Sequence, residues 1–326
     1  MSSSMRAVRL VAAPGGPVPR VVEVPAPGAP TGTQLLVRVV ASSVNGTDLG
    51  LVRGGRAFRA LSAGRVAPGF DLAGEVVACG PAVTGFTVGD RVMTLLGHGG
   101  GAQAELVLVP QHRVARAPVG VDLQQAAAVP LAGLTALQAL HGRAGLHARR
   151  SPRVLVVGAA GGIGAFAVQL ARLAGAHVTA VADEQRAAFV SDLGADVVVD
   201  RHRQDVLALG ERWDVVFDVP GALRFSSVRP VLKAAGVLVS TRPLSVDAVR
   251  GLAQREGPRV SAVATRRSPV DLAHLAHLID TGRLRIPLDR VVGLEDVAAA
   301  YAHTASGQLR GKVVIAVAEA RAPVAT

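Results

Sequence analysis

Residues 153–164 read Arg-Val-Leu-Val-Val-Gly-Ala-Ala-Gly-Gly-Ile-Gly. The apolar run predicts a buried strand, and the glycine-rich turn after it opens an alanine-rich helix. Gly161 would let the backbone approach a pyrophosphate, and Gly164 would let the helix pack close to the strand. Free N–H groups at a helix N-terminus attract phosphate. Although Ala159 stands where this fingerprint has its first glycine, the stretch predicts a dinucleotide-binding turn made by Ala160, Gly161, Gly162, Ile163 and Gly164.

The next predicted strand, 177–182, ends at Asp183, about 20 residues beyond the turn, where an acid binds the hydroxyls of the adenosine ribose. An acid there repels a 2′-phosphate and favours NADH over NADPH. Arg186 could instead bind that phosphate, and Asp183 could simply cap the following helix. The sequence thus predicts NAD(P)H as cofactor, with Asp183 favouring NADH.

The predicted elements divide the chain into two parts with different secondary structure. Short apolar runs separated by Pro- and Gly-rich turns predict a β-rich start, with strands at 7–12, 35–41, 74–78, 91–95 and 104–109. From residue 123 strands and helices alternate, which predicts a parallel sheet covered on both faces. Its expected strands are 153–157, 178–182, 197–199, 215–218, 236–240 and 260–263, with helices at 123–129, 133–143, 164–174 and 185–193. Helices at 269–281 and 294–305 and a strand at 312–317 follow.

Composition narrows the class of protein. A chain of 326 residues that is 50% hydrophobic normally forms two domains. Its single cysteine excludes an internal disulfide and a thiolate metal cluster. The net charge of +11 comes from scattered arginines, and aromatic residues are 3%, so nucleic acid is not an expected partner. No apolar run is long enough to span a membrane, and the Ser-rich start does not resemble a signal peptide, so we expect a cytoplasmic protein.

Several motifs together carry a family resemblance. In order they are Ala-Ser-Ser-Val-Asn-Gly-Thr-Asp (41–48), Pro-Gly-Phe-Asp-Leu-Ala-Gly-Glu-Val-Val (68–77), Gly-Phe-Thr-Val-Gly-Asp-Arg-Val (85–92), Ala-Ala-Ala-Val-Pro-Leu-Ala-Gly-Leu-Thr-Ala (126–136), the turn above, and Gly-Lys-Val-Val-Ile (311–315). With these motifs the chain resembles the zinc-independent quinone oxidoreductase-like branch of the medium-chain dehydrogenase/reductase superfamily, which includes enoyl reductases.

The resemblance implies an α/β fold with two domains and an active site in the cleft. A discontinuous GroES-like β-rich catalytic domain would comprise residues 1–121 and 267–326. A Rossmann domain with a doubly wound parallel sheet would comprise residues 122–266. Homodimers are common in this branch, and family precedent favours NADPH.

The resemblance also argues against a metal. Zinc alcohol dehydrogenases of the superfamily bind catalytic zinc at positions that correspond here to Asn45, Phe70 and Leu131. Phenylalanine and leucine have no lone-pair donor for zinc, and the remaining carboxylate, Asp71, is insufficient by itself. Residues 97–102 stand where the cysteines of a structural zinc lobe would be.

Without a Lewis acid, an easier hydride acceptor is expected: a quinone, or a C=C bond conjugated to a carbonyl, as in an enone or enoyl thioester, in a detoxifying or secondary-metabolite reaction. The resemblance implies that Asn45 and Thr135 act at the reaction centre and touch the cofactor, with further cofactor contacts from Val219, Ser240 and Thr241. Asn45 could instead be a turn residue, and Thr135 could bond its own helix.

Two other functions stay open from the sequence. One is a zinc-free oxidoreductase acting on alcohols or ketones. The other is a non-redox protein that binds a dinucleotide on the same fold, as a cyclase, an isomerase or a regulator. The only tyrosine, Tyr301, is expected to be structural, so no proton donor is predicted.

Overall fold

The computed structural model describes residues 4–14, 16–54, 66–242 and 257–318. The chain divides into two compact units. The first unit is formed by Met1–Leu131, Arg267–Gly282 and Leu288–Thr326, and the second by Ala132–Arg266 and Arg283–Pro287. Among the described residues no helix is long and apolar enough to cross a membrane.

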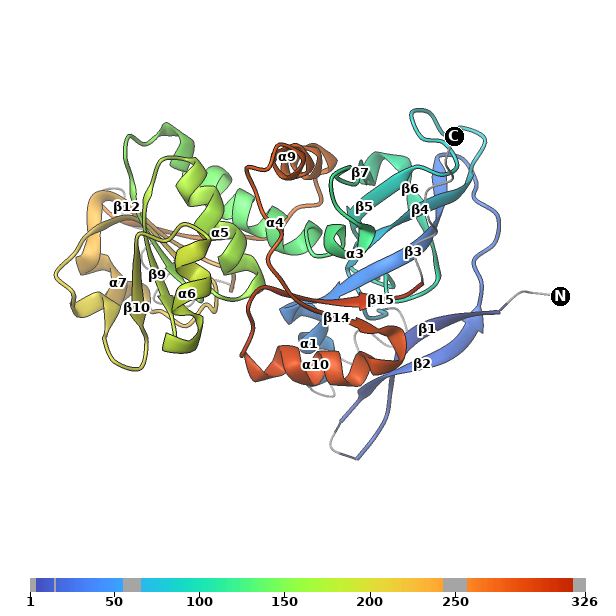
Figure 1. The fold of residues 1–326 in the computed structure, drawn as a ribbon, viewed down its shortest axis with the longest axis horizontal. Helices are drawn as coiled ribbons and strands as arrows, with labels where there is room; N and C mark the ends of the chain where they lie inside the picture. Colours follow the sequence, from blue (N-terminus) through green and yellow to red (C-terminus); the bar gives the residue numbers. More distant parts are fainter. Residues whose placement is uncertain (1–3, 15, 55–65, 243–256, 319–326) are drawn as a thin grey trace. The chain divides into compact units, whose positions relative to one another are not determined.

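The second unit is built on a parallel sheet. Its strands lie in the order β10 (Val197–Asp200), β9 (His177–Ala182), β8 (Arg153–Val157), β11 (Trp213–Asp218), β12 (Leu232–Ser240) and β13 (Arg259–Ala262). The chain winds outward from β8 in one direction and from β11 in the other, which makes the doubly wound sheet that the family resemblance implies. Figure 1 shows β9, β10 and β12 of this sheet with the helices of the same unit around them. The topological switch point therefore lies between β8 and β11, and sheets of this kind bind ligands at the carboxyl ends of the strands there.

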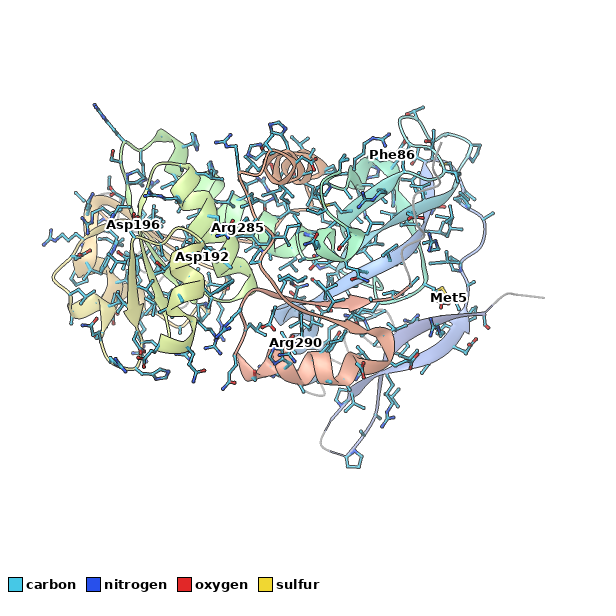
Figure 2. The ribbon with its side chains drawn as sticks, in the orientation of Figure 1. Met5, Phe86, Asp192, Asp196, Arg285 and Arg290 are labelled. Atoms are coloured by element: carbon cyan, nitrogen blue, oxygen red, sulfur yellow. The ribbon has the colours of Figure 1, made fainter. Side chains whose placement is uncertain are left out.

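Helices cover this sheet because each has a stripe of apolar residues to bury. α5 (Gly162–Leu173) packs on β8 and β9, and α6 (Glu184–Asp192) packs on β9 and β10. α7 (Phe225–Val228) lies against β12. α4 (Pro130–Leu137) continues into a π-helix, Gln138–Arg143, where the sequence predicts one regular helix. Arg285 ion-pairs with Asp192 at the end of α6, 3.4 Å apart (Figure 2).

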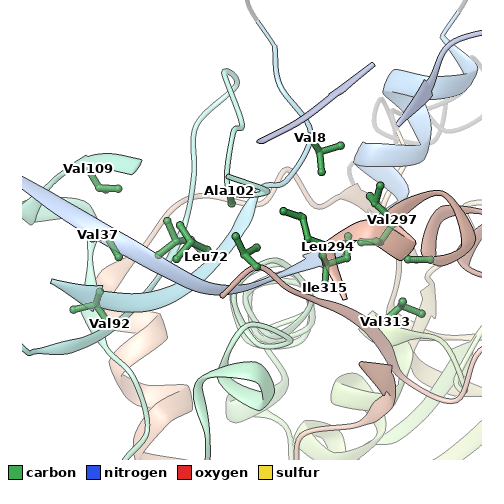
Figure 3. Close-up of a cluster of buried hydrophobic side chains, with 14 of the residues drawn as sticks. Val8, Val37, Leu72, Val92, Ala102, Val109, Leu294, Val297, Val313 and Ile315 are labelled. Atoms are coloured by element: carbon green, nitrogen blue, oxygen red, sulfur yellow. The ribbon is translucent and has the colours of Figure 1, made fainter. Parts of the chain in front are cut away.

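The first unit is a mixed sheet in the order β14 (Leu288–Gly293), β15 (Lys312–Ala316), β3 (Gln34–Val44), β4 (Asp71–Cys79), β5 (Arg91–Leu95) and β7 (Ala115–Arg116), with β6 (Leu106–Pro110) also paired to β3. Its helices are α1 (Gly46–Arg53), α3 (Leu123–Ala126), α9 (Pro269–Asp280) and α10 (Val297–Ser306). Side chains from β3, β4, β5 and β15 meet those of α10 in one apolar core, part of which Figure 3 shows.

Three strands escape the sequence analysis: β2, β7 and β14. β2 (Val18–Pro25) pairs with β1 (Ser4–Val11), although the prolines around 14–19 predict a turn. The strand is possible because β2 pairs with β1 alone, so Pro19 and Pro25 interrupt no ladder on a second side. β7 has only two residues, too few for a pattern. β14 has a largely exposed sequence with two charged residues, in which no alternation of apolar and polar residues can be recognised.

Candidate functional site

Two glycines, Gly158 and Gly164, shape the predicted dinucleotide-binding turn of the second unit, which we call the phosphate turn. Gly158 has a φ of 76°, so the left-handed residue that the tight turn needs lies one position before Ala159. This explains why alanine is tolerated at 159, where the sequence analysis expects the first glycine. A Cβ added to Gly164 would lie 2.2 Å from the Gly158 carbonyl oxygen, so α5 and β8 can approach this closely only with glycine there.

The N-terminus of α5 is open for an anion. Its N-cap, Gly161, has no side chain to accept from the first-turn N–H groups of Gly162, Ile163 and Gly164. The first intrahelical bond runs from the Ala165 N–H to the Gly161 carbonyl at 2.9 Å. No side chain of the described residues caps these donors, and together with the helix dipole they fit the pyrophosphate of a dinucleotide.

The end of β9 presents a carboxylate. Asp183 is the N-cap residue of α6, but its side chain makes no capping bond. Its Oδ2 is bound by the Arg186 guanidinium, with Arg201 3.7 Å away. Its Oδ1 is buried and accepts no hydrogen bond within the described structure. A buried carboxylate oxygen without a donor suits a ribose hydroxyl.

Hydrogen bonds connect the residues that end β11 and β12. The Thr241 hydroxyl donates to the Val219 carbonyl at 2.7 Å, and the Ser240 hydroxyl accepts from the Arg242 N–H at 3.1 Å. The buried Asp218 carboxylate accepts from the N–H groups of Gly221 and Leu223 at 3.0 and 2.7 Å, which fixes the turn after β11. Val219, Ser240 and Thr241 thus lie at the same carboxyl edge as the phosphate turn and Asp183.

Thr135 lies on α4 in the same unit and is buried. Its hydroxyl is 2.7 Å from that of Thr265, which follows β13. The side chain of Gln138 binds the backbone of Arg266, the residue after Thr265. It accepts from the Arg266 N–H at 2.8 Å and donates to the Arg266 carbonyl at 2.9 Å. The chain beyond β13 is therefore fixed against α4. Thr265, which the sequence analysis does not name, becomes a candidate site residue through its contact with Thr135.

Asn45 belongs to the first unit, where it is part of a buried polar cluster. Its Nδ2 donates to Asp71 Oδ2 at 2.8 Å, and its Oδ1 accepts from the Lys312 ammonium. Asp71 also accepts from the Leu131 N–H at 2.6 Å and from the Ser43 hydroxyl. Asp71 thereby ties together β3, β4 and the start of α4, with Lys312 as the buried cation beside it.

Asp48 is the second buried carboxylate of this cluster. It accepts from the Asn45 N–H at 2.9 Å and from the Gly69 N–H at 2.8 Å. Burial raises its pKa to about 6, against the lowering effect of these two bonds. Tyr301, on α10, donates to Gln103 at 3.1 Å, and burial together with the Asp48 charge raises its pKa well above the usual value.

The raised pKa of Asp48 predicts a pH-dependent stability. The folded protein holds this proton up to about pH 6, whereas the unfolded chain releases it near pH 4. The contribution of Asp48 is therefore complete below pH 4 and falls by up to about 3 kcal/mol as the pH rises through 6. Urea unfolding of the wild type and Asp48→Asn should show a stability difference that declines from pH 4 to pH 7. A difference that stays constant, or that grows with pH, contradicts the assignment.

Sequence reasoning also misses Lys312 and Asp218, which both lie within apolar strand patterns. The partners of Lys312 are 241 to 268 residues away, so only the pairing of β15 with β3 reveals its role. The partners of Asp218 are the nearby N–H groups of Gly221 and Leu223, which the strand pattern does not indicate.

Known proteins share this architecture. Residues 31–119 match the alcohol dehydrogenase GroES-like domain, and residues 193–315 match the zinc-binding dehydrogenase family. The chain is 33% identical over 312 residues to a chloroplast envelope quinone oxidoreductase homolog of Arabidopsis thaliana, covering 90% of this chain and 92% of that protein. It is 28% identical to a 2-methylene-furan-3-one reductase of Solanum lycopersicum, covering 86% and 71%. The solved quinone oxidoreductase of Coxiella burnetii superposes with a TM-score of 0.86 at 29% identity, covering 97% and 100%.

Proposed function

The chain belongs to the quinone oxidoreductase-like branch of the medium-chain dehydrogenase/reductase superfamily, and we propose that it reduces an activated C=C bond or a quinone without zinc. It is an NAD(P)H-dependent oxidoreductase. The observation that carries the proposal is the carboxyl edge of the parallel sheet. There, among the described residues, no side chain caps the first N–H groups of α5 and Oδ1 of Asp183 accepts no hydrogen bond, so the two fit the pyrophosphate and the ribose of an adenosine diphosphate.

The bound nicotinamide would supply the hydride. The residues of this chain would do the rest. Gly161 to Gly164 would bind the pyrophosphate, and Val219, Ser240 and Thr241 would line the path toward the nicotinamide. Thr135, held by Thr265, would orient the ring, and Asn45 would donate to the acceptor oxygen on which charge develops.

Zinc does not suit the donor set at the corresponding positions. Phe70 and Leu131 offer hydrocarbon, and the oxygen of Asn45 is taken by the Lys312 ammonium. A divalent cation at Asn45 would also meet the positive charge of Lys312. Within the ranges that the structure describes, no three His, Cys, Asp or Glu side chains form a possible metal site. These features support a zinc-independent reaction.

The proposed acceptors share one chemistry, a carbon or oxygen that takes hydride while charge moves onto a carbonyl oxygen. The names of the relatives include a quinone and a 2-methylene-furan-3-one, in which a methylene carbon is conjugated to a ketone. The test follows NADH and NADPH absorbance with quinones, enones, enoyl thioesters and simple ketones. We expect turnover with quinones or conjugated acceptors and none with simple ketones. Cofactor binding without turnover of any acceptor contradicts the proposal.

We expect NADH to bind more tightly than NADPH, because the free oxygen of Asp183 can accept from a ribose hydroxyl and repels a phosphate. In Asp183→Ser, Arg186 and Arg201 lose this carboxylate and can bind a 2′-phosphate. The Kd for NADPH divided by the Kd for NADH should fall by roughly 100-fold, equivalent to about 2.7 kcal/mol in favour of NADPH. Glu184→Gln, which breaks the exposed pair with Arg203, serves as control and should leave the ratio nearly unchanged. A wild type that already prefers NADPH contradicts this proposal.

A cytoplasmic location and a homodimer stay predictions. The strands at the edges of the parallel sheet are β10 and β13, and a dimer joined there would continue the sheet. Light scattering coupled to size exclusion measures the assembly directly.

A further inference from the structure

Three rare residues of this chain meet in one buried cluster. Asn45 is the only asparagine, although there are 11 glutamines, and Tyr301 is the only tyrosine. Lys312 is one of only two lysines beside 33 arginines. All three are at most 5% exposed. Asn45 and Lys312 both contact Asp71. The Asn45 N–H donates to Asp48, and Tyr301 lies close enough to Asp48 for its charge to raise the tyrosine pKa. The chain therefore uses residue types here that it avoids almost everywhere else.

The geometry gives a reason for lysine at this place. The Lys312 ammonium donates to the Val44 carbonyl at 3.1 Å and to Asn45 Oδ1, and lies 3.5 Å from Asp71 Oδ2. A compact ammonium directs three N–H groups from a single nitrogen to acceptors around it, whereas the larger guanidinium of arginine spreads its donors over one plane. The other lysine, Lys233, forms a half-exposed ion pair with Asp214 at 2.6 Å, where either cation would suffice.

The same contacts fix the orientation of the Asn45 amide. Lys312 has no acceptor atom, so the oxygen of the amide must face it and Nδ2 must face away. One Nδ2 proton is bound by Asp71 at 2.8 Å. The second has only a long contact, 3.5 Å, with the Ser43 carbonyl. Asn45 thus keeps one weakly engaged N–H, and the positive charge on its oxygen side makes that N–H a stronger donor.

We propose that Lys312 is a positioning residue for the reduction, holding and polarising the Asn45 amide so that its second N–H binds the oxygen on which charge develops. The inference rests on the proposed function, since it assigns Lys312 a part in the same reaction. Lys312 acts through Asn45 and does not touch the acceptor, because the contacts of its ammonium lie within the cluster.

The test combines kinetics with a spectroscopic signature. Growth on [15N]asparagine labels one side chain, so NMR of the whole protein gives a single pair of Nδ2 protons. In the wild type one proton should exchange slowly and the other faster. In Lys312→Met both signals should move. With the best acceptor from the panel, kcat should fall by about 10- to 100-fold, which is less than the roughly 100- to 1,000-fold loss on complete removal of a donor to a developing oxyanion, because the Asn45 N–H stays in place. The Kd of the cofactor should stay unchanged.

A double-mutant cycle separates positioning from folding. Lys312→Met leaves the buried charge of Asp71 without its counter-ion. The double variant Lys312→Met/Asp71→Asn therefore removes both charges, and Asp71→Asn is its reference. Asn45→Ala should lower kcat in the wild type and have little further effect in the Lys312→Met or the double variant. Lys233→Met is the matched control and should keep wild-type kcat.

The outcomes are distinct. If folded Lys312 variants keep wild-type kcat, or if the losses for Lys312 and Asn45 are fully additive, the inference is wrong while the proposed function stands. If the wild type reduces no acceptor, the proposed function is wrong and the inference falls with it. Equal exchange of the two Nδ2 protons in the wild type overturns the inference even if no variant folds.

Discussion

Gly164→Ala is expected to destabilise the second unit and to abolish dinucleotide binding. The new Cβ would lie 2.2 Å from the Gly158 carbonyl oxygen and 2.7 Å from the Ala159 Cα, and both are backbone atoms of the phosphate turn. Relief requires α5 to move away from β8, which costs about 3 kcal/mol as overpacking and displaces the helix N-terminus from the phosphates. Thermal unfolding and calorimetric titration with NADH measure the two effects.

Gly161→Ala separates the two effects. A Cβ there would have only an ordinary contact, 3.5 Å from the Gly158 carbonyl oxygen, so the stability should hardly change. It would nevertheless stand where the pyrophosphate approaches the backbone, and the Kd for NADH should rise by at least about 10-fold. Gly142→Ala, with nothing within 4 Å of the added Cβ, is the neutral control. Unchanged cofactor binding in Gly161→Ala and Gly164→Ala would show that this turn does not hold the dinucleotide.

Asp71→Ala is expected to lower the free energy of unfolding by about 3–5 kcal/mol, the usual cost of leaving a buried charge without its partner. Lys312 would lose its counter-ion at 4% exposure, and the Leu131 N–H and the Ser43 hydroxyl would lose their acceptor. Urea unfolding monitored by circular dichroism measures the change.

Glu75→Ala on the same strand is the matched control. Its carboxylate pairs with Arg38 on β3, and both side chains keep about a fifth of their surface exposed. Such a pair contributes on the order of 1 kcal/mol or less. Equal losses in the two variants would mean that the Asp71 cluster is no more important to the fold than a surface ion pair.

The strands of the parallel sheet could be predicted from sequence because each is a short apolar run between turn residues. Residues 153–157 are identical in prediction and structure, and Asp183 is found directly after β9. β2 could not be predicted, because its prolines indicate a turn and only its lone pairing with β1 makes them acceptable. The fingerprint places its first glycine at position 159, where this chain has alanine, whereas the structure gives the left-handed conformation to Gly158.

The sequence alone determined the alternation of strands and helices that builds the parallel sheet and the glycine-rich turn after its first strand, since both follow from local periodicity and from glycine. The doubly wound order and the absence of zinc ligands at Asn45, Phe70 and Leu131 are what the family resemblance implies. Tertiary structure alone decided which polar groups meet. Lys312 and Asn45 are 267 residues apart and Thr135 and Thr265 are 130 apart, so each pair forms only when strands and helices pack. Burial then decides their chemistry, because an ammonium or carboxylate removed from water must find its partners within the protein.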